Sequence, residues 1–333
     1  MSRPNSAQCR WFAFGAAAGM ALAFGIACDP AAAQPDYPNR NIRMIYGFPP
    51  GADGGLRLMA DKLSEVLGKS VIVENLTGAG GNIATDRIAK AAPDGYTIGA
   101  LNSASTVINP NLYAKLPYDP IKDLIPITLI WAYPNVLMVS NEVPAKTVQG
   151  LVALARAKPG ELTFGHSGLG TTQHLGGEMM QSLAGISIQQ VPYRGPPQIA
   201  TDLMTGRISA AFLPPGASWQ LVQEGRFRAL AVTSRTRAAF APELPTMIES
   251  GFPEFEMTVW FGLFVPAGTP QSIVSRINKE MARIVKHPDV IKLFATGGAE
   301  AVSSTPEEFV AMIKAEGPYW AKVIKDAGIK PLE

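Results

Sequence analysis

Hydrophobic and polar positions along this chain follow the pattern of short strands that each lead into a helix. The run 42–46 is apolar and extended in character, a glycine- and proline-rich loop follows it, and 56–67 carries apolar residues at helical spacing. Strands that alternate with helices at this spacing predict a parallel sheet with helices on both faces. The expected strands are 42–46, 71–74, 97–101, 125–131, 136–139, 162–164, 188–191, 208–213, 229–232 and 259–265.

The helices predicted between these strands fall into two similar sets. Each set presents polar loops where its strands end, and this arrangement indicates two lobes with a cleft between them. The main expected helices are 56–67, one beginning near Asn82, 148–158, one that follows the loop 166–172 and runs through 183, 199–205, 272–285 and 306–327.

The stretch 74–109 organises the first set. Gly78, Gly80 and Gly81 allow positive φ and a close backbone approach just before a helix that Asn82 would cap. Residues Ile83, Ala84, Ile88, Ala91 and Ala92 are expected to line one face of that helix.

Those glycines do not make a nucleotide site. A dinucleotide fingerprint needs a third glycine where Ile83 stands, and no Gly-Lys-Ser/Thr triplet of a phosphate-binding loop follows. A tight turn that feeds a helix is the simpler interpretation, and an anion held there would have to use helix N-terminal amides.

The N-terminal residues predict export. Arg3 and Arg10 precede the uncharged apolar run 11–26, and Ala31-Ala32-Ala33 offers a cleavage site, so 1–33 reads as a signal peptide of a periplasmic protein. A lipid anchor at Cys28 is the second interpretation, because Gly25 stands where a lipobox needs a larger aliphatic residue. Cys9 and Cys28 both precede the predicted cut, so the mature chain would carry no disulfide.

Charge and catalytic motifs exclude several functions. The formal net charge is only +2, without basic clusters, which gives no reason to propose a nucleic acid or an anionic membrane as partner. Residues 165–169 resemble a nucleophile elbow around Ser167, but Leu169 stands where that motif needs glycine. His166, His174 and His287 do not form a metal-ligand set. We therefore expect no enzyme, no cofactor and no metal, and a secreted serine hydrolase using Ser167 stays open as a distant alternative.

Several long motifs, in register along essentially the whole mature chain, resemble the periplasmic substrate receptors of tripartite tricarboxylate transporters, often called Bug receptors. These motifs are FPPG at 48–51, RLMADKLSEVLG at 57–68, VIVEN-x-x-GAGGN at 71–82, AKAAPDGYT at 89–97, INPNLYAKLPYDPIKDL at 108–124, PNVLMV at 134–139, VPYRG at 191–195, FRALAVTS at 227–234 and WFGLFVPAGTP at 260–270.

The resemblance implies a two-lobed α/β, type II periplasmic-binding-protein fold that closes on a small organic carboxylate. Residues 35–137 and 258–333 would form the first lobe and 138–257 the second, with chain crossings near 134–139 and 259–265. The implied partners are the ligand and separate membrane permease subunits of the transporter, with the receptor monomeric. A periplasmic sensor that reports to a signalling kinase is the alternative.

Carried over by motif, the resemblance implies contacts from loops at the ends of strands. Backbone amides, hydroxyls and water would hold the ligand carboxylate, without a dominating arginine. Tyr193 could equally pack within its lobe, and Arg194 could be a solvated charge at the rim. The implied ligand-binding residues are Phe48, Pro50, Gly51, Asp53, Asn102, Ser103, Ala104, Ser105, Gly168, Gly170, Thr171, Thr172, His174, Tyr193, Arg194, Leu213 and Pro214.

Two departures from the family pattern matter. The first loop is about two residues shorter than usual, which leaves open whether Asp53 contacts the ligand. Leu213-Pro214 stands where many relatives carry Asp-Asn, so that wall should be more apolar. We therefore expect a ligand with a substantial hydrocarbon or aromatic body rather than a hydroxyl-rich one such as citrate.

Overall fold

The computed structural model describes residues 37–51 and 53–332, which belong to one compact unit. The predicted signal peptide, its cleavage site and Cys28 lie outside the described residues. Within the described ranges, no helix is both long enough and apolar enough to cross a bilayer.

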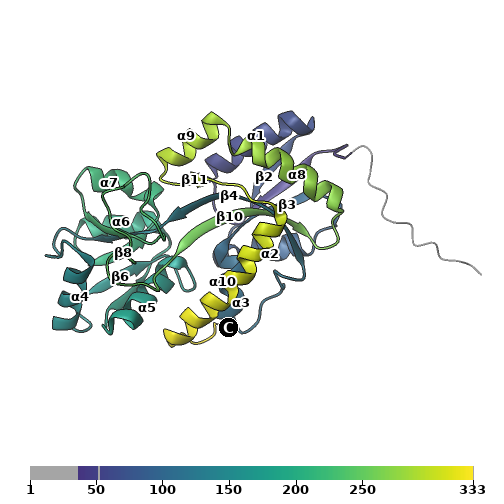
Figure 1. Cartoon of the computed structure of the whole chain (residues 1–333). Coiled ribbons are helices and arrows are strands. Elements are labelled where there is room, and N and C mark those ends of the chain that lie inside the picture. Colours follow the sequence, from purple (N-terminus) through teal and green to yellow (C-terminus); the bar gives the residue numbers. More distant parts are fainter. Residues whose placement is uncertain (1–36, 52, 333) are drawn as a thin grey trace, which may run out of the picture. The chain divides into compact units, whose positions relative to one another are not determined.

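A six-stranded sheet, in the order β11-β4-β10-β3-β1-β2, forms the centre of what we call the first lobe (Figure 1). β1 pairs in parallel with β2 and β3, as expected for strands joined by α1 and α2. The elements of this lobe are β1 (Ile42–Tyr46), α1 (Gly54–Leu67), β2 (Val71–Asn75), α2 (Asn82–Ala89), β3 (Thr97–Asn102), a π-helix (Ala104–Ile108), α3 (Asn109–Leu112), β4 (Leu124–Pro134), β10 (Thr258–Pro266), α8 (Gln271–Ile284), α9 (Pro288–Thr296), β11 (Glu300–Ala301) and α10 (Pro306–Asp326).

A five-stranded sheet, in the order β7-β6-β8-β5-β9, forms the centre of the second lobe. β6 pairs in parallel with β7 and β8, again through helical crossovers. Its elements are β5 (Val136–Val139), α4 (Val148–Ala157), β6 (Thr163–His166), α5 (Thr172–Ala184), β7 (Gln189–Pro192), α6 (Pro196–Met204), β8 (Ala210–Leu213), a 3-10 turn (Pro215–Ala217), α7 (Trp219–Gln223) and β9 (Arg228–Val232).

The expectation of a parallel sheet is correct only in part, because both sheets are mixed. β10 runs antiparallel to β3 and β4, and β5 runs antiparallel to β8 and β9. The physical reason is the connectivity: β4 leaves the first sheet for the second, and β10 returns. A strand that returns from another sheet needs no right-handed crossover and can pair antiparallel to its neighbours.

Three local expectations are wrong. The segment after β3, predicted as a polar loop, is helical over Ala104–Ile108. Asn82 is the first residue of α2 rather than its cap, which is Gly81 at φ 105°. The predicted buried face of α2 is correct for Ala84 and Ile88, which are fully buried, but Ile83 is 48% exposed, and Ala91 and Ala92 lie beyond the end of the helix at Ala89.

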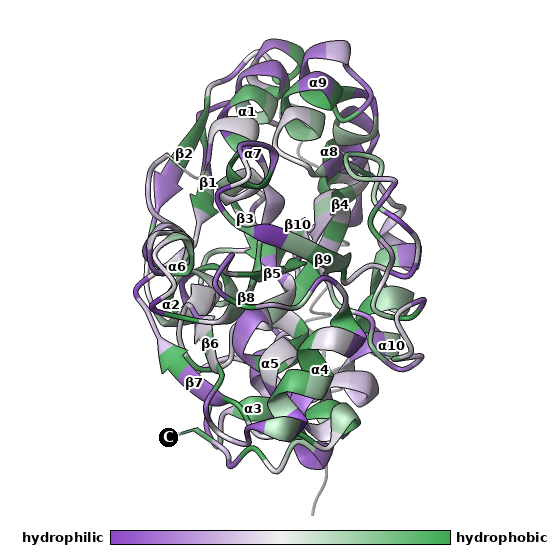
Figure 2. Ribbon diagram, turned by 90° about the vertical axis from the view of Figure 1, so that its left-hand side faces the viewer, coloured by the Kyte–Doolittle hydropathy of each residue, from purple (hydrophilic) through white to green (hydrophobic). Residues whose placement is uncertain are grey.

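The lobes are stabilised by apolar clusters on the sheet faces. Met44, Leu63 and Ile277 lie in the cluster between the first sheet and helices α1 and α8. A second cluster packs α6 against the second sheet and includes Ile199 and Leu203. In Figure 2, α4 carries both hydrophobic and hydrophilic segments, as expected for a helix with one buried face.

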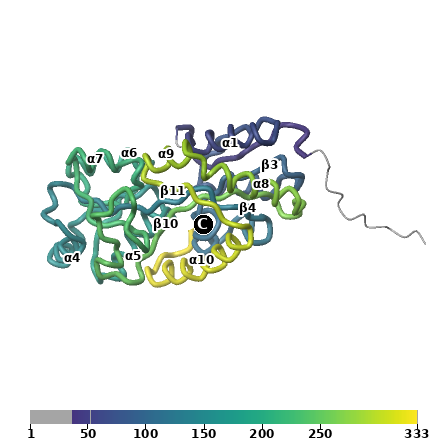
Figure 3. Tube along the Cα trace, turned by 45° about the horizontal axis from the view of Figure 1, so that its top comes forward, coloured from purple at the N-terminus to yellow at the C-terminus, as the bar shows by residue number. Residues whose placement is uncertain are grey.

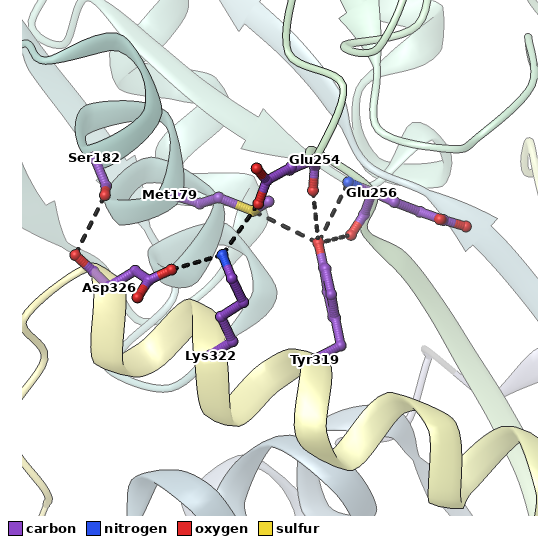
Figure 4. Close-up of polar contacts among 7 residues, drawn as sticks. All are labelled: Met179, Ser182, Glu254, Glu256, Tyr319, Lys322 and Asp326. Carbon is purple, nitrogen blue, oxygen red and sulfur yellow. Dashed lines mark hydrogen bonds and ion pairs between the residues drawn. The ribbon is translucent and has the colours of Figure 1, made fainter.

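Helix α10 belongs to the first lobe but also contacts the second (Figure 3). Figure 4 shows that the Tyr319 hydroxyl donates to the carbonyl oxygen of Glu256 at 2.7 Å. Lys322 Nζ lies 3.1 Å from a carboxylate oxygen of Glu254, and the Ser182 hydroxyl of α5 lies 3.3 Å from the Asp326 carbonyl oxygen. The C-terminal end of α10, from Tyr319 to Asp326, therefore connects the first lobe to the second lobe. It also connects the first lobe to the chain just before β10.

Glu316 occupies an unusual place on the buried side of α10. The Trp260 indole Nε1 lies 3.0 Å from both of its carboxylate oxygens. Burial raises the pKa of Glu316 to about 7, helped by the nearby Glu256 carboxylate and opposed by the hydrogen bonds from Trp260 and Trp320. The native state therefore holds a proton here that the unfolded chain releases at about pH 4.5.

This raised pKa predicts a specific pH dependence of stability. The contribution of Glu316 is favourable below about pH 4.5, is lost as pH rises through about 7, and is constant above that. Glu316→Gln, which stays neutral and keeps an acceptor for the indole, should stabilise the protein at about pH 8 by on the order of 2 kcal/mol. At about pH 4.5 it should have little effect.

Thermal midpoints of both proteins across this range test the prediction. The quantity to compare is the difference between the midpoints of variant and wild type, because the effects of all other titrating groups cancel in it. A difference that does not change with pH would contradict it.

Candidate functional site

The first predicted loop follows β1 and is closed by Asp53, which is only 3% exposed. Its carboxylate accepts hydrogen bonds from the Gly51 amide at 3.0 Å, Arg57 Nε at 2.9 Å and Asn75 Nδ2 at 3.0 Å. Burial alone would raise the pKa of Asp53, but these bonds outweigh it and hold the pKa below its usual range. The carboxylate is thus engaged within its own lobe and holds the loop in shape.

Phe48, in the same loop, belongs to a row of aromatic rings. It lies 5.3 Å from the Tyr46 ring and 5.6 Å from the Phe261 ring, measured between centroids. Trp131 stacks on Phe261 at 4.4 Å and is followed by Phe294 at 5.3 Å. Phe48 is half-buried, so this row brings an apolar face to the loop.

The second predicted group, Asn102–Ser105, is a compact helical turn after β3. Asn102 Oδ1 accepts from the Ser105 amide at 3.2 Å, and the Thr106 hydroxyl donates to the Asn102 carbonyl oxygen at 2.8 Å. Ala104 is 8% exposed. The buried Ser103 hydroxyl has no hydrogen-bond partner among the described residues.

Two glycines bring the first and second groups together. A Cβ on Gly47 would lie 3.0 Å from the Gly81 Cα, and a Cβ on Gly81 would lie 3.2 Å from Asn102 Oδ1. Gly81 also has φ 105°, so a side chain there would be strained as well as crowded. The glycine turn predicted from sequence therefore allows the backbone at Gly47 and the side chain of Asn102 to approach Gly81 closely.

The third group, Gly168–Thr172, lies in the second lobe and leads into α5. Thr171 caps the helix: its hydroxyl accepts from the His174 amide at 3.4 Å and donates to the Gly168 carbonyl at 2.8 Å. Gly170, at φ 77°, contacts the first lobe, since a Cβ there would lie 2.5 Å from Leu112 Cδ2. This loop of the second lobe therefore touches α3 of the first.

His174 and His166 lie behind this loop with ring centroids 4.9 Å apart. Burial lowers the pKa of His174 to about 4, assisted by repulsion from His166. Burial also lowers the pKa of His166 and raises that of Glu178, whose carboxylate lies 4.0 Å from His174 Nε2. Both imidazoles are thus neutral at pH 7 and bring no positive charge to the loop.

The remaining predicted residues lie around the second sheet. Tyr193 donates to Asp202 at 2.9 Å and packs against the α6 cluster, and its amide donates to the His166 carbonyl oxygen, so it lies next to the third group. Arg194 is exposed, Leu213 is fully buried in that cluster, and Pro214 is half-buried.

The surroundings of Ser167 are relevant to the alternative that the protein is a serine hydrolase with Ser167 as its nucleophile. The Ser167 hydroxyl is buried and, within the described part of the chain, makes no hydrogen bond. The neighbouring His166 Nδ1 instead accepts from the Gly168 amide at 3.2 Å. The contact between nucleophile and base that a serine hydrolase needs is not made here. Across residues 37–51 and 53–332, no group of three His, Cys, Asp or Glu could hold a metal ion.

Sequence reasoning missed Asn135, which is 0% exposed between β4 and β5. Its Nδ2 donates to the Thr172 hydroxyl at 3.1 Å, and its backbone exchanges hydrogen bonds with Thr233. Asn135 thus fixes the start of α5 at a chain crossing between sheets. The available signal was a lone amide between two apolar strands in the stretch 124–139.

The comparisons with known proteins agree with this architecture. Residues 56–329 match the model of the tripartite tricarboxylate transporter family receptor, and the chain belongs to that family of solute-binding receptors. It is 35% identical to BugT of Bordetella pertussis over 297 residues, covering 88% of this chain and 91% of that protein.

Solved structures show the same two-lobed fold. Rpa4515 of R. palustris with adipate aligns with a TM-score of 0.81 at 35% identity, covering 89% of this chain and 100% of that one. MatC of Rhodopseudomonas palustris with bound malate aligns with a TM-score of 0.77 at 27% identity, covering 86% and 100%. Adipate and malate, the ligands of these two related proteins, are both small dicarboxylates.

The buried histidines predict that stability falls in acid. A native pKa of about 4 for His174, against about 6.5 when unfolded, means that its neutral burial favours folding above about pH 6.5. That contribution is lost as pH falls toward 4. The thermal midpoint of His174→Gln should therefore fall less than that of wild type between about pH 7 and 4.5. This effect on the pH dependence of stability is opposite in sign to that of Glu316→Gln. A midpoint in the variant that falls as steeply as in wild type would refute this.

Proposed function

We propose that this chain is an extracytoplasmic solute receptor that captures a small organic carboxylate between two lobes and delivers it to the permease subunits of a tripartite tricarboxylate-type transporter. Family membership supports this proposal, together with the contact of Gly170 with Leu112, which brings a loop of each lobe together. The lobes would comprise 35–137 with 258–333, and 138–257.

The proposed site recognises an anion without a buried countercharge. The Asp53 carboxylate is compensated within its own lobe, the histidine pair is neutral, and Arg194 is exposed. The hydroxyl of Ser103 and the first backbone amides of α5 remain as hydrogen-bond donors to the proposed ligand. Such groups stabilise a carboxylate without the desolvation cost of a buried ion pair.

The ligand proposed for this site has a substantial hydrocarbon body. The half-buried Phe48 brings the aromatic row to the first loop, and the half-buried Pro214 follows β8 directly. Apolar carbon placed against such surfaces gains roughly 0.8 kcal/mol per buried methylene. The adipate of the Rpa4515 structure is a chain of this kind.

Ligand binding would act by shifting an equilibrium between open and closed forms. A ligand that contacts loops of both lobes binds the closed form more tightly and so favours it. A second contact between the lobes supports this view, because a Cβ on Gly298 would lie 2.6 Å from Pro215. The closed receptor, monomeric and released by cleavage of its signal peptide, would then dock on the permease.

A thermal-shift screen of the mature protein tests the proposal. Linear dicarboxylates such as adipate should raise the unfolding midpoint by several degrees when their free concentration is about 100 times the dissociation constant. Ligand at that concentration stabilises the folded protein by about 2.7 kcal/mol. Citrate should give a smaller shift at the same concentration. Calorimetric titration then gives the dissociation constants.

Protein refolded from denaturant, and so freed of co-purified ligand, serves as the control. Failure of this protein to bind any mono-, di- or tricarboxylate would overturn the receptor proposal. A preference for citrate over adipate would overturn only the hydrocarbon-body proposal.

A further inference from the structure

Three buried polar side chains from distant parts of the first lobe meet behind the predicted ligand loops. Asn82, Asn109 and Tyr118 are 6%, 3% and 6% exposed. Asn109 Nδ2 donates to Asn82 Oδ1 at 2.6 Å, and the Tyr118 hydroxyl lies 2.8 Å from the same oxygen. A single amide oxygen thus joins the start of α2, the start of α3 and the loop before β4.

This triad contacts the backbone of the Asn102–Ser105 turn. The Tyr118 hydroxyl also lies 2.8 Å from the Ser105 carbonyl oxygen. Since a hydroxyl has one proton, it shares that proton between Asn82 Oδ1 and the Ser105 carbonyl. The turn carrying Ser103 and Ser105 is therefore tied to α2 by a side chain that is not itself at the predicted site.

The triad also reaches the second lobe. A Cβ on Gly170 would lie 3.4 Å from Asn109 Oδ1, so the third predicted loop rests against the same asparagine that donates to Asn82. One connected set of hydrogen bonds and contacts thus runs from the serine turn of the first lobe to the glycine loop of the second.

Packing alone does not explain this arrangement. Burying two amides and a phenol is unfavourable unless each is hydrogen-bonded, and apolar side chains would fill the same space without that requirement. A satisfied polar network instead fixes geometry, because each bond has a narrow range of distance and angle.

We propose that Asn82, Asn109 and Tyr118 are positioning residues that hold the Asn102–Ser105 turn and the Gly168–Thr172 loop in the geometry that receives the ligand. This inference rests on the proposed carboxylate-receptor function. The three residues do not contact the ligand, and they raise affinity by reducing the reorganisation that binding would otherwise require.

Tyr118→Phe provides the sharpest test because it removes one hydroxyl and keeps the ring. Tyr118 is among the residues that line a groove of about 420 Å³, and the substitution leaves its ring in place. Tyr96→Phe is the matched control: Tyr96 is 7% exposed in the same lobe, and its hydroxyl bonds to Asn39 at 2.8 Å.

A second pair of variants uses one helix. Asn109→Ala removes the donor to Asn82, whereas Asn111→Ala removes a donor to the Val107 and Gly317 carbonyls, away from the triad. Both substitutions delete a hydrogen-bonded amide from α3, but Asn109 is 3% exposed and Asn111 is half-buried, so Asn111→Ala should lower the unfolding midpoint by the smaller amount.

The experiment measures ligand affinity by calorimetry, with the best dicarboxylate from the screen, alongside the unfolding midpoint of each variant. Tyr118→Phe and Asn109→Ala should weaken binding about 5- to 10-fold, as expected when a hydrogen bond that fixes geometry is lost. Tyr96→Phe and Asn111→Ala should also lower the midpoint but leave affinity within about twofold of wild type.

Hydrogen exchange of the ligand-free protein gives a readout that needs no ligand. The amides of 103–105 and 168–172 should exchange faster in Tyr118→Phe than in Tyr96→Phe. Unchanged affinity and exchange in the triad variants would overturn the inference while leaving the receptor function intact. If wild type itself bound no carboxylate, the receptor function would fail, and this inference would fail with it.

Discussion

The antiparallel pairing of β4 with β10 is the interaction on which the arrangement of both lobes depends. These strands pair from Leu124 with Pro266 to Pro134 with Thr258, the longest ladder within the described residues. One strand leaves the first sheet and the other returns to it, so the ladder fixes where both connections to the second sheet begin. A register slip of one residue would exchange the side chains that these strands bury on the two faces of the sheet.

The β4–β10 ladder also fixes the positions of residues near the candidate site. Asn135 follows β4 directly and reaches Thr172, so the start of α5 is fixed relative to the end of the first sheet. On β10, Trp260 meets Glu316 and so connects the ladder to α10, which contacts the second lobe further along. Contacts made by both lobes are thus anchored to two hydrogen-bonded strands rather than to flexible loops.

The local parts of this fold could be predicted from sequence because their causes are local. The alternation of apolar residues, interrupted by glycine and proline, located the elements of the β1–α1–β2–α2–β3 unit to within about three residues. The mixed sheets could not be predicted in this way, because strand direction depends on which sheet a strand joins after a long excursion. The hydrophobic pattern is the same for either direction.

The positions of the candidate loops were predictable from sequence, but the contacts that their residues make were not. Gly81 was singled out as a conformational glycine, yet the neighbour that crowds it, Asn102, is far along the chain. Asp53 was an open question because a carboxylate near a loop can face a ligand or its own backbone. Only the positions of Arg57 and Asn75 decide which occurs.

An uncharged site has a consequence for selectivity. Where a buried arginine provides the attraction, any carboxylate gains most of it, and discrimination depends on the rest of the pocket. Where amides and hydroxyls share the anion, each contributes little, so the ligand body must supply the remaining affinity. In the proposed site, the aromatic row from Tyr46 through Phe48 and Phe261 to Trp131 would then favour carbon over hydroxyl, since a ligand hydroxyl buried against rings loses its water without replacement. Selectivity among carboxylates would follow from the shape of the hydrocarbon rather than from the number of its charges.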